Sequence, residues 1–194
     1  MKYRTIVVDP PWPGVSFPAL HSLGTTGWKR HGDEGSERNP PPFTPMSLPE
    51  IAALPVANLA EGDAHLYLWT LNRYLESAYD MARGWGFRPV QLLTWCKSPM
   101  GVIGGAFIQS SEYVLFCRRG RLRHHSRGRS TWFQWPRTRH YTESGYTQHS
   151  TKPEAFLDMV ETVSPGPYLE LFARRNRLGW DTWGNEALEH VELG

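Results

Sequence analysis

The tetrapeptide Asp9-Pro10-Pro11-Trp12 is the first pattern in the chain whose residue types could carry out chemistry. The Asp9 carboxylate and the Pro10 carbonyl are hydrogen-bond acceptors, and proline keeps its acceptor although it lacks a backbone donor. Two consecutive prolines stiffen the turn, so both acceptors would be held in place before a ligand arrives. Trp12 adds a flat face on which a nucleobase could stack. Rigid acceptors beside an aromatic face suit an amino group on a base.

An amino group on a nucleobase is a poor nucleophile because its lone pair is delocalised into the ring. Group transfer to this nitrogen needs acceptors that stabilise the developing positive charge, and an electrophile held in line a few ångströms away. A base inside a duplex must also leave the stack before it reaches such a pocket. Residues 9–12 match the acceptor part of this requirement. By itself, the tetrapeptide is also compatible with a turn that merely ends a strand.

The net charge of +2 conceals an uneven distribution of charge along the chain. Residues 118–140 contain eight arginines, three histidines and no acidic residue, which leaves 13 basic and 19 acidic residues elsewhere. A positive segment on an acidic body is expected of a protein that binds a polyanion such as nucleic acid. A solvated basic loop without a partner is the alternative. The residues predicted to contact phosphates or bases are Arg121, Arg123, Arg127, Arg129, Trp132, Phe133 and Trp135.

Apolar runs and capping residues predict the elements that must position these groups. Runs without clean alternation are typical of strands covered on both faces, as in parallel α/β sheets. Helix starts are indicated by the capping-box spacing of Ser47 and Glu50, by Asn72, and by Ser150 or Thr151. The predicted strands are residues 5–8, 64–69, 90–95, 113–117 and 168–172, and the predicted helices are residues 48–54, 72–83 and 151–163.

Strands that alternate with helices favour a doubly wound α/β fold, and no repeat or linker divides residues 1–194 into more than one domain. Two stretches, about residues 13–45 and 118–148, lack regular periodicity and are predicted to be long variable loops. The first loop follows Asp9 at the carboxyl end of a strand, where ligands of open α/β sheets bind. The position of the tetrapeptide therefore favours a functional site.

Composition disfavours several other classes of protein. Cys96 and Cys117 lie in apolar runs typical of buried reduced thiols, and no regular spacing of His and Cys indicates a metal site. The chain begins directly with a short apolar strand, which differs from a signal peptide or a membrane span. We therefore expect a cytoplasmic protein without a metal ion or a membrane partner.

Residues 5–12 resemble the core motif of the adenosine N6-methyltransferase family, which includes the eukaryotic messenger-RNA N6-methyladenosine writers and bacterial and phage relatives. Further blocks are similar in the same order over nearly the whole chain, apart from the two variable loops. These blocks are residues 68–73, 95–97, 111–116, 152–154, 164–166, 170–174 and 183–186. The resemblance implies a Rossmann-like methyltransferase sheet and an enzyme that uses S-adenosylmethionine to methylate the N6 amine of adenine in nucleic acid.

The resemblance also implies roles for single residues. Residues 9–12 would form the catalytic motif, and Lys152 would pair with the methionine carboxylate of S-adenosylmethionine. Arg174, Asn176 and Asn185 would form hydrogen bonds with the ribose region of the cofactor. The cofactor-binding residues implied in this way are Asp9, Lys152, Glu170, Arg174, Asn176, Asn185 and Glu186.

Departures from the family pattern concern the end of the site that would hold the cofactor's adenine. Only eight residues precede Asp9, so the upstream strand and acidic residue that often line this pocket are not in their usual place. The glycine-rich fingerprint of many methyltransferases is absent, and residues 170–174 stand in its place. Position 186 is Glu where some relatives carry an amide.

DNA is the favoured substrate, because the small single-domain form resembles bacterial and phage members of the family. An RNA adenosine N6-methyltransferase and a catalytically silent nucleic-acid-binding homologue are the alternatives, although the intact motif at residues 9–12 argues against the silent form. A cytosine N4 methyltransferase would face the same electronic problem. The target sequence is left open, as is assembly into a homodimer or with a partner subunit.

Overall fold

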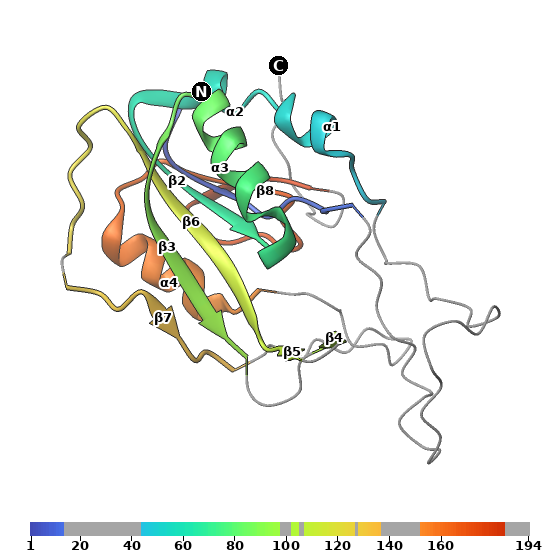
Figure 1. Cartoon of the computed structure of the whole chain (residues 1–194). Coiled ribbons are helices and arrows are strands. Elements are labelled where there is room, and N and C mark those ends of the chain that lie inside the picture. The colour runs from blue at the N-terminus through green and yellow to red at the C-terminus, as the bar shows by residue number, and fades with distance from the viewer. Residues whose placement is uncertain (14–43, 98–101, 105–106, 127, 137–151, 185–194) are drawn as a thin grey trace, which may run out of the picture.

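A seven-stranded sheet in the order β7-β3-β6-β2-β1-β8-β9 forms the centre of the molecule (Figure 1). The computed structural model describes residues 1–13, 44–97, 102–104, 107–126, 128–136 and 152–184. The strands of the sheet are β1 (Tyr3–Val8), β2 (Ala60–Thr70), β3 (Arg88–Cys96), β6 (Ser111–Arg119), β7 (Trp132–Phe133), β8 (Tyr168–Leu171) and β9 (Trp180–Trp183). A separate hairpin consists of β4 (Val102–Gly104) and β5 (Phe107–Gln109). The helices are α1 (Leu48–Ala52), α2 (Val56–Leu59), α3 (Leu75–Gly84) and α4 (Glu154–Val163), with a 3₁₀ turn, η2 (Asn72–Tyr74), before α3.

The sheet is mixed. β1 pairs in parallel with β2 and β8, β8 with β9, and β3 with β7. β6 lies antiparallel between β2 and β3. The predicted α/β class and the five predicted strands are confirmed, but the expectation of a parallel sheet is wrong for β6. Helices cover both faces of the sheet, so a central strand is apolar on both sides whichever way it runs.

Alternation along the strands directs side chains into two hydrophobic cores, one on each face of the sheet. On β1, Ile6 and Val8 enter the core that contains residues of α1 and α3. Val7 enters the other core, together with Phe156 and Val160 of α4. Figure 1 shows α3 and α4 on opposite faces of the sheet. Residues two apart on a strand therefore face the same helix layer, and this alternation decides which layer lies beside each functional side chain.

Two predicted helix starts have different outcomes. The capping box before α1 is confirmed, because the Ser47 hydroxyl accepts from the Glu50 backbone N–H and the Glu50 carboxylate accepts from the Ser47 N–H at 2.7 Å. The prediction that Asn72 caps α3 is wrong, because Asn72 begins η2 and the N-cap position is Tyr74. The extra 3₁₀ turn places the Tyr74 ring parallel to Trp12, with ring centroids 5.0 Å apart.

The start of α4 and several short elements also differ from the prediction. α4 begins at Glu154 with Pro153 in the N-cap position, so neither Ser150 nor Thr151 is the cap, and both lie outside the described residues. The sequence did not predict α2, β7 or β9, which have four, two and four residues. Segments this short contain too few residues for hydrophobic periodicity to indicate them.

Several segments that resemble blocks of the methyltransferase family lie at one edge of the sheet, the edge formed by the carboxyl ends of the parallel strands. β1, β2, β3, β8 and β9 end at this edge, and the antiparallel β6 begins there. Most of the first predicted loop lies outside the described residues, as do residues 127 and 137–148 of the second, whereas residues 118 and 119 belong to β6. Among the described helices, none has the length and apolar character needed to span a membrane.

Candidate active site

Asp9 and Lys152 form an ion pair at this edge of the sheet. Asp9 directly follows β1, and Lys152 lies two residues before α4. The Lys152 ammonium is 2.8 Å from the Asp9 carboxylate, and the two side chains are only 13% and 17% exposed. The pair therefore links the Asp-Pro-Pro-Trp turn to the start of the helix that covers the same face of the sheet.

A second acidic residue, Glu112, completes a cluster of four charges. Glu112 is the second residue of β6, and its carboxylate lies 3.5 Å from the Lys152 ammonium. The other carboxylate oxygen forms an ion pair with Lys97, which directly follows β3. The two ammonium groups also lie over aromatic rings, Lys152 at 5.1 Å from the centroid of Trp69 and Lys97 at 4.9 Å from that of Trp95. Cation–π contacts of this kind favour the charged form of lysine.

Electrostatic interactions oppose the effect of burial on two of these side chains, Lys152 and Glu112. Burial acts against the charge on Lys152, but the carboxylates of Asp9 and Glu112 outweigh it and raise the pKa of Lys152. Burial likewise acts against the charge on Glu112, but Lys152 and Lys97 outweigh it and lower the pKa of Glu112. Two negative and two positive side chains therefore stabilise one another.

Backbone hydrogen bonds hold the Asp-Pro-Pro-Trp turn against its neighbours. The Asp9 N–H donates to the Leu171 carbonyl at 3.3 Å, and the Trp12 N–H donates to the Pro10 carbonyl at 2.9 Å. The Pro11 carbonyl accepts from the backbone N–H of Met46 at 2.9 Å. A carbonyl oxygen has two lone pairs, so the Pro10 oxygen retains one acceptor position.

Trp12 does not offer the open stacking face expected from the sequence. Its side chain is buried, stacks on Tyr74, and donates from the indole nitrogen to the Trp69 carbonyl at 3.1 Å. A buried indole must satisfy its N–H donor, and the end of β2 provides the acceptor. Trp12 therefore fixes the turn that holds Asp9, whereas the sequence predicted a surface for the target base.

The predicted nucleic-acid-binding residues are divided between two edges of the sheet. Arg121 follows β6, whose last residue is about 23 Å from Glu112 at roughly 3.3 Å per residue. The Arg121 N–H donates to the Asp63 carboxylate near the start of β2. Arg121 and Arg123 are exposed, and they lie at the edge of the sheet opposite Asp9. The loop prediction missed this placement because the direction of β6 was not predicted.

The later part of the basic segment returns to the edge that carries Asp9. In β7, Trp132 pairs with Thr94 near the end of β3, and its side chain is 57% exposed. Trp135 is half-buried, and its carbonyl accepts from the indole of Trp95 at 3.0 Å. Arg129 is exposed just before β7, and Arg127 lies outside the described residues. Trp132 is thus an exposed predicted contact toward the Asp9 side of the sheet, and the exposed Arg129 precedes it by three residues.

A family model, MT-A70, matches residues 3–186. The chain belongs to the MT-A70 family of N6-adenine methyltransferases. The type II methyltransferase M.MunI of a Mycoplasma species is 26% identical over 193 residues, which cover 95% of this chain and 78% of that protein.

Two eukaryotic proteins are similar at comparable levels of identity. The N(6)-adenosine-methyltransferase MT-A70-like protein of Drosophila melanogaster is 26% identical, with 99% of this chain and 28% of that protein covered. The N6-methyladenosine RNA methyltransferase MTA1 of Cryphonectria parasitica is 27% identical, with 96% and 52% covered. The chain spans about half of the second protein and less than a third of the first.

MT-A70 methyltransferases use S-adenosylmethionine, and the end of β8 has features that fit this group. Glu170 lies in β8, and its Oε2 atom is buried without a hydrogen-bond partner. Burial and the nearby Asp9 carboxylate raise the pKa of Glu170 to about 7. An orphaned acceptor of this kind suits a ligand that brings hydroxyl donors, as a ribose does.

The other residues implied to bind the cofactor lie beyond the ends of β8 and β9. Arg174 is half-buried, and its charge acts against the positive charge of Lys152. Asn176 is exposed, and its amide donates to the Thr182 hydroxyl at 3.3 Å. Asn185 and Glu186 lie outside the described residues. Among the described residues, no group of three or more His, Cys, Asp or Glu side chains is arranged to hold a metal ion.

Sequence reasoning missed two members of the charged cluster, Lys97 and Glu112. Both stand at the ends of predicted strands, where a charged residue beside an apolar run was available as a signal. Whether such residues meet depends on strand direction, because Glu112 reaches the edge of Asp9 only if β6 runs antiparallel to β2. Arg175 was missed as well; its guanidinium donates to the Lys152 carbonyl at 3.4 Å and pairs with Glu154 at 3.3 Å.

Proposed function

We propose that this MT-A70 chain transfers the methyl group of S-adenosylmethionine to the exocyclic N6 of adenine in DNA. The observation that carries the proposal is the Asp9 carboxylate, held at the carboxyl end of β1 by Lys152 at 2.8 Å. This acceptor lies beside a Pro10 carbonyl with a remaining lone pair, as the chemistry of an aromatic amine requires. The ion pair orients Asp9 before the substrate arrives, so little reorganisation is needed during the reaction.

In this mechanism Asp9 and Pro10 accept hydrogen bonds from the two N–H groups of the adenine amine. S-adenosylmethionine supplies an electrophilic methyl group on a sulfonium. As the new N–C bond forms, positive charge develops on N6, and the Asp9 carboxylate stabilises it. The methyl–sulfur bond of the cofactor would break as the N–C bond forms, which would leave a neutral thioether, and N6 would release one proton to solvent. Lys152 holds the carboxylate in place, and Trp12 fixes the turn from the opposite face of the sheet.

The residues of this chain that would hold S-adenosylmethionine surround the same edge. Lys152, which lies beside Asp9 and Glu112, would pair with the methionine carboxylate, as the family resemblance implies. The buried oxygen of Glu170 would accept from a ribose hydroxyl. Arg174 would bind the same part of the cofactor, as the family resemblance implies. Asn176, Asn185 and Glu186 stay predictions from the family resemblance.

DNA is favoured over RNA by the relative that this chain covers most completely. M.MunI is named as a type II methyltransferase, and 78% of its length is covered, whereas the relative named as an RNA methyltransferase is covered over 52%. The RNA relatives keep RNA as the second candidate substrate. Recognition of RNA would involve its 2′-hydroxyl, and a direct comparison of substrates tests for it.

Mass spectrometry of nucleosides tests the reaction and the substrate together. Purified protein and S-adenosylmethionine are incubated with mixed-sequence duplex DNA, single-stranded DNA or RNA, which are then digested to nucleosides. We expect N6-methyladenine from DNA, and a loss of at least about 100-fold in Asp9→Asn because one charged acceptor is removed. Asp80→Asn, a change at an exposed acidic residue of α3, is the matched control. N4-methylcytosine as the product, or full activity of Asp9→Asn, would refute the mechanism.

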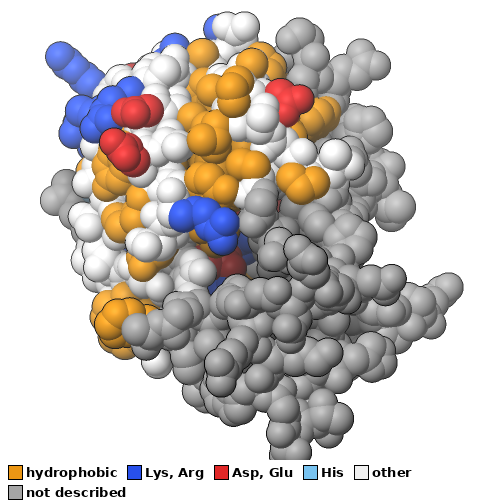
Figure 2. All heavy atoms as spheres, turned by 45° about the vertical axis from the view of Figure 1, so that its right-hand side comes forward, with side chains coloured by type: hydrophobic (Ala, Val, Ile, Leu, Met, Phe, Trp, Pro, Cys, Tyr) orange, Lys and Arg blue, Asp and Glu red, His pale blue; other side chains and the backbone are white. Residues whose placement is uncertain are grey.

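The contact with nucleic acid is proposed to follow the Asp9 edge of the sheet. Trp132 lies toward this edge and Arg129 precedes it by three residues, with β7 about 19 Å from β1 at roughly 4.8 Å per strand spacing. Figure 2 shows, on one described face, a band of apolar side chains with acidic and basic side chains beside it. Arg129→Ala should therefore reduce the salt dependence of DNA binding by about one phosphate contact. Arg123→Ala, at the opposite edge, should leave the binding of a short oligonucleotide unchanged.

A further inference from the structure

A cavity opens between η2 and the β4–β5 hairpin, and two of its lining residues lie on either side of Glu112 in β6. Its volume is about 370 Å³, which lies in the range of pockets that hold small organic ligands. We name it the flanking pocket. Its lining residues are Asn72, Arg73, Phe107, Gln109, Ser110, Ser111 and Tyr113.

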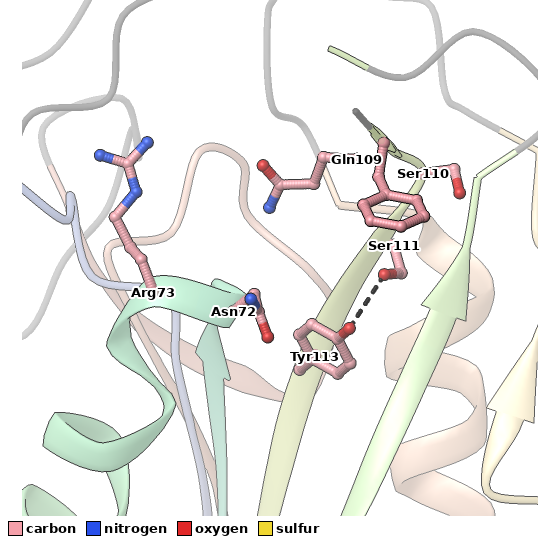
Figure 3. A pocket seen from close by; sticks show the side chains of 7 residues that line it. Asn72, Arg73, Gln109, Ser110, Ser111 and Tyr113 are labelled. Carbon is pink, nitrogen blue, oxygen red and sulfur yellow. Dashed lines mark hydrogen bonds between the residues drawn. The ribbon is translucent and has the colours of Figure 1, made fainter. Parts of the chain in front are cut away.

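The polar side chains of the flanking pocket can recognise the edge of a base. Asn72 and Gln109 each offer an amide with donors and an acceptor, which is the combination that reads base edges in nucleic-acid complexes. Figure 3 shows the Gln109 amide directed across the pocket toward Asn72 and Arg73. On the β6 side, the Ser111 hydroxyl donates to the Tyr113 hydroxyl at 3.1 Å, which fixes the phenol at the wall.

The pocket is also lined by an aromatic ring and a guanidinium, which suit the base and the phosphate of a nucleotide. Phe107 lies at the rim with 84% of its side chain exposed, an unusual position for a large apolar ring in water. Exposed aromatic rings provide stacking surfaces for bases. Arg73 is exposed and is the only charged residue among the seven described lining residues. A guanidinium is suited to a phosphate because its donors match two phosphate oxygens.

The flanking pocket lies at the same edge of the sheet as Asp9. Consecutive residues of a strand point to opposite faces, so Glu112 enters the charged cluster and Tyr113 lines the pocket on the other face. Asn72 follows Trp69 by three residues, and Trp69 provides both the carbonyl that holds Trp12 and the ring beneath Lys152. A nucleic-acid strand that crosses this edge with one nucleotide at Asp9 therefore passes the pocket with its neighbour.

We propose that the flanking pocket binds the nucleotide next to the target adenine and selects its base. In this arrangement the base stacks on Phe107, its edge forms hydrogen bonds with Asn72 and Gln109, and its phosphate pairs with Arg73. The assignment of the ligand rests on the proposed function, because it takes nucleic acid as the substrate. It makes the pocket a determinant of sequence specificity within the chain itself.

The test uses DNA oligonucleotides with one adenine and randomised bases on both sides. The methylated products are sequenced to give the base preference at each flanking position, and KM and kcat are measured for the pool. We expect the wild-type chain to prefer one base by about tenfold at one flanking position. The double variant Asn72→Ala/Gln109→Ala should reduce that preference to less than about threefold, with kcat for the pool changed less than the preference. Asn58→Ala, at an exposed amide of α2, is the matched control.

Arg73→Ala provides a second, independent measurement. It should raise KM for the pool about tenfold without removing the base preference, whereas Arg83→Ala, at an exposed arginine of α3, should change neither. A double variant that keeps the full base preference would overturn the proposal. If the wild-type chain methylates no oligonucleotide, the proposed function fails, and the pocket is then judged by binding of the same fluorescein-labelled oligonucleotides. Binding by Arg73→Ala as tight as that of the wild type would overturn the pocket separately.

Discussion

Replacement of Glu112 by Gln should destabilise the protein through an unbalanced charge. The carboxylate lies between the ammonium groups of Lys97 and Lys152, and the three side chains are 10%, 17% and 13% exposed. Gln has nearly the same shape, so the change leaves no cavity. It leaves two largely buried ammonium groups with Asp9 as the remaining carboxylate of the cluster.

The size of the effect follows from the burial of this cluster. Removal of one partner of a buried ion pair costs about 3 kcal/mol or more, because the partner charge remains in a poorly solvated place. For a chain of 194 residues this corresponds to a decrease in Tm of roughly 6–12 °C. The double variant Glu112→Gln/Lys97→Met removes one charge of each sign and should recover the stability to within about 1 kcal/mol, since an apolar replacement of a buried pair is often neutral.

Urea denaturation followed by circular dichroism at pH 7 measures these differences. Because the pKa of Glu112 is lowered in the folded state, its contribution is present above its ordinary pKa of 4.5 and is lost as the pH falls through the folded value. Glu76→Gln, at an exposed acidic residue of α3, is the control. A loss smaller than about 1 kcal/mol for Glu112→Gln would contradict the charge argument, since breaking a buried pair should cost more. A double variant less stable than the single one would contradict it as well.

Three further predictions concern other parts of the fold. Affinity for S-adenosylmethionine, measured by calorimetry, should rise between pH 6 and 8 because Glu170, with a pKa of about 7, accepts a hydroxyl more strongly when it is ionised. Glu170→Gln should abolish this rise. Burial lowers the pKa of His65 from 6.5 to about 4, so in this pH range the unfolded state binds a proton that the folded state does not. The free energy of unfolding should therefore decrease by about 1.4 kcal/mol for each unit that the pH falls below 6.5. Melts at pH 5 to 7 should show this slope for the wild type and not for His65→Gln. Gly184→Ala should lower the free energy of unfolding by about 2 kcal/mol, because the added methyl group would come within 2.7 Å of the Ala173 backbone nitrogen. Gly62→Ala, where the added methyl group has open space, is the control and should cost little in the same thermal melts. Equal melting temperatures for the two glycine variants would show that the backbone of residues 173–184 yields without strain.

Local sequence patterns were sufficient to predict several features of this structure. An apolar run followed by an acid and two prolines predicts a buried strand that ends in a stiff turn, and β1 and Asp9 confirm it. Capping chemistry predicts α1 correctly because Ser47 and Glu50 interact within one turn of the same helix. Lys152, which was predicted from the family resemblance, lies beside Asp9 in the structure. The number of residues between the two in the chain does not by itself indicate this contact.

Contacts between distant segments decided the rest. The direction of β6 places Glu112 beside Lys152 and carries Arg121 to the opposite edge of the sheet, so one pairing adds a residue to the site and removes another. The same holds for Trp12, which the sequence offers as an open aromatic face and the fold buries against Tyr74. Hydrophobic pattern reports which side chains must leave water, and this requirement is the same for a parallel and an antiparallel strand. Which charges meet depends on register and strand direction, and these arise only when the whole sheet assembles.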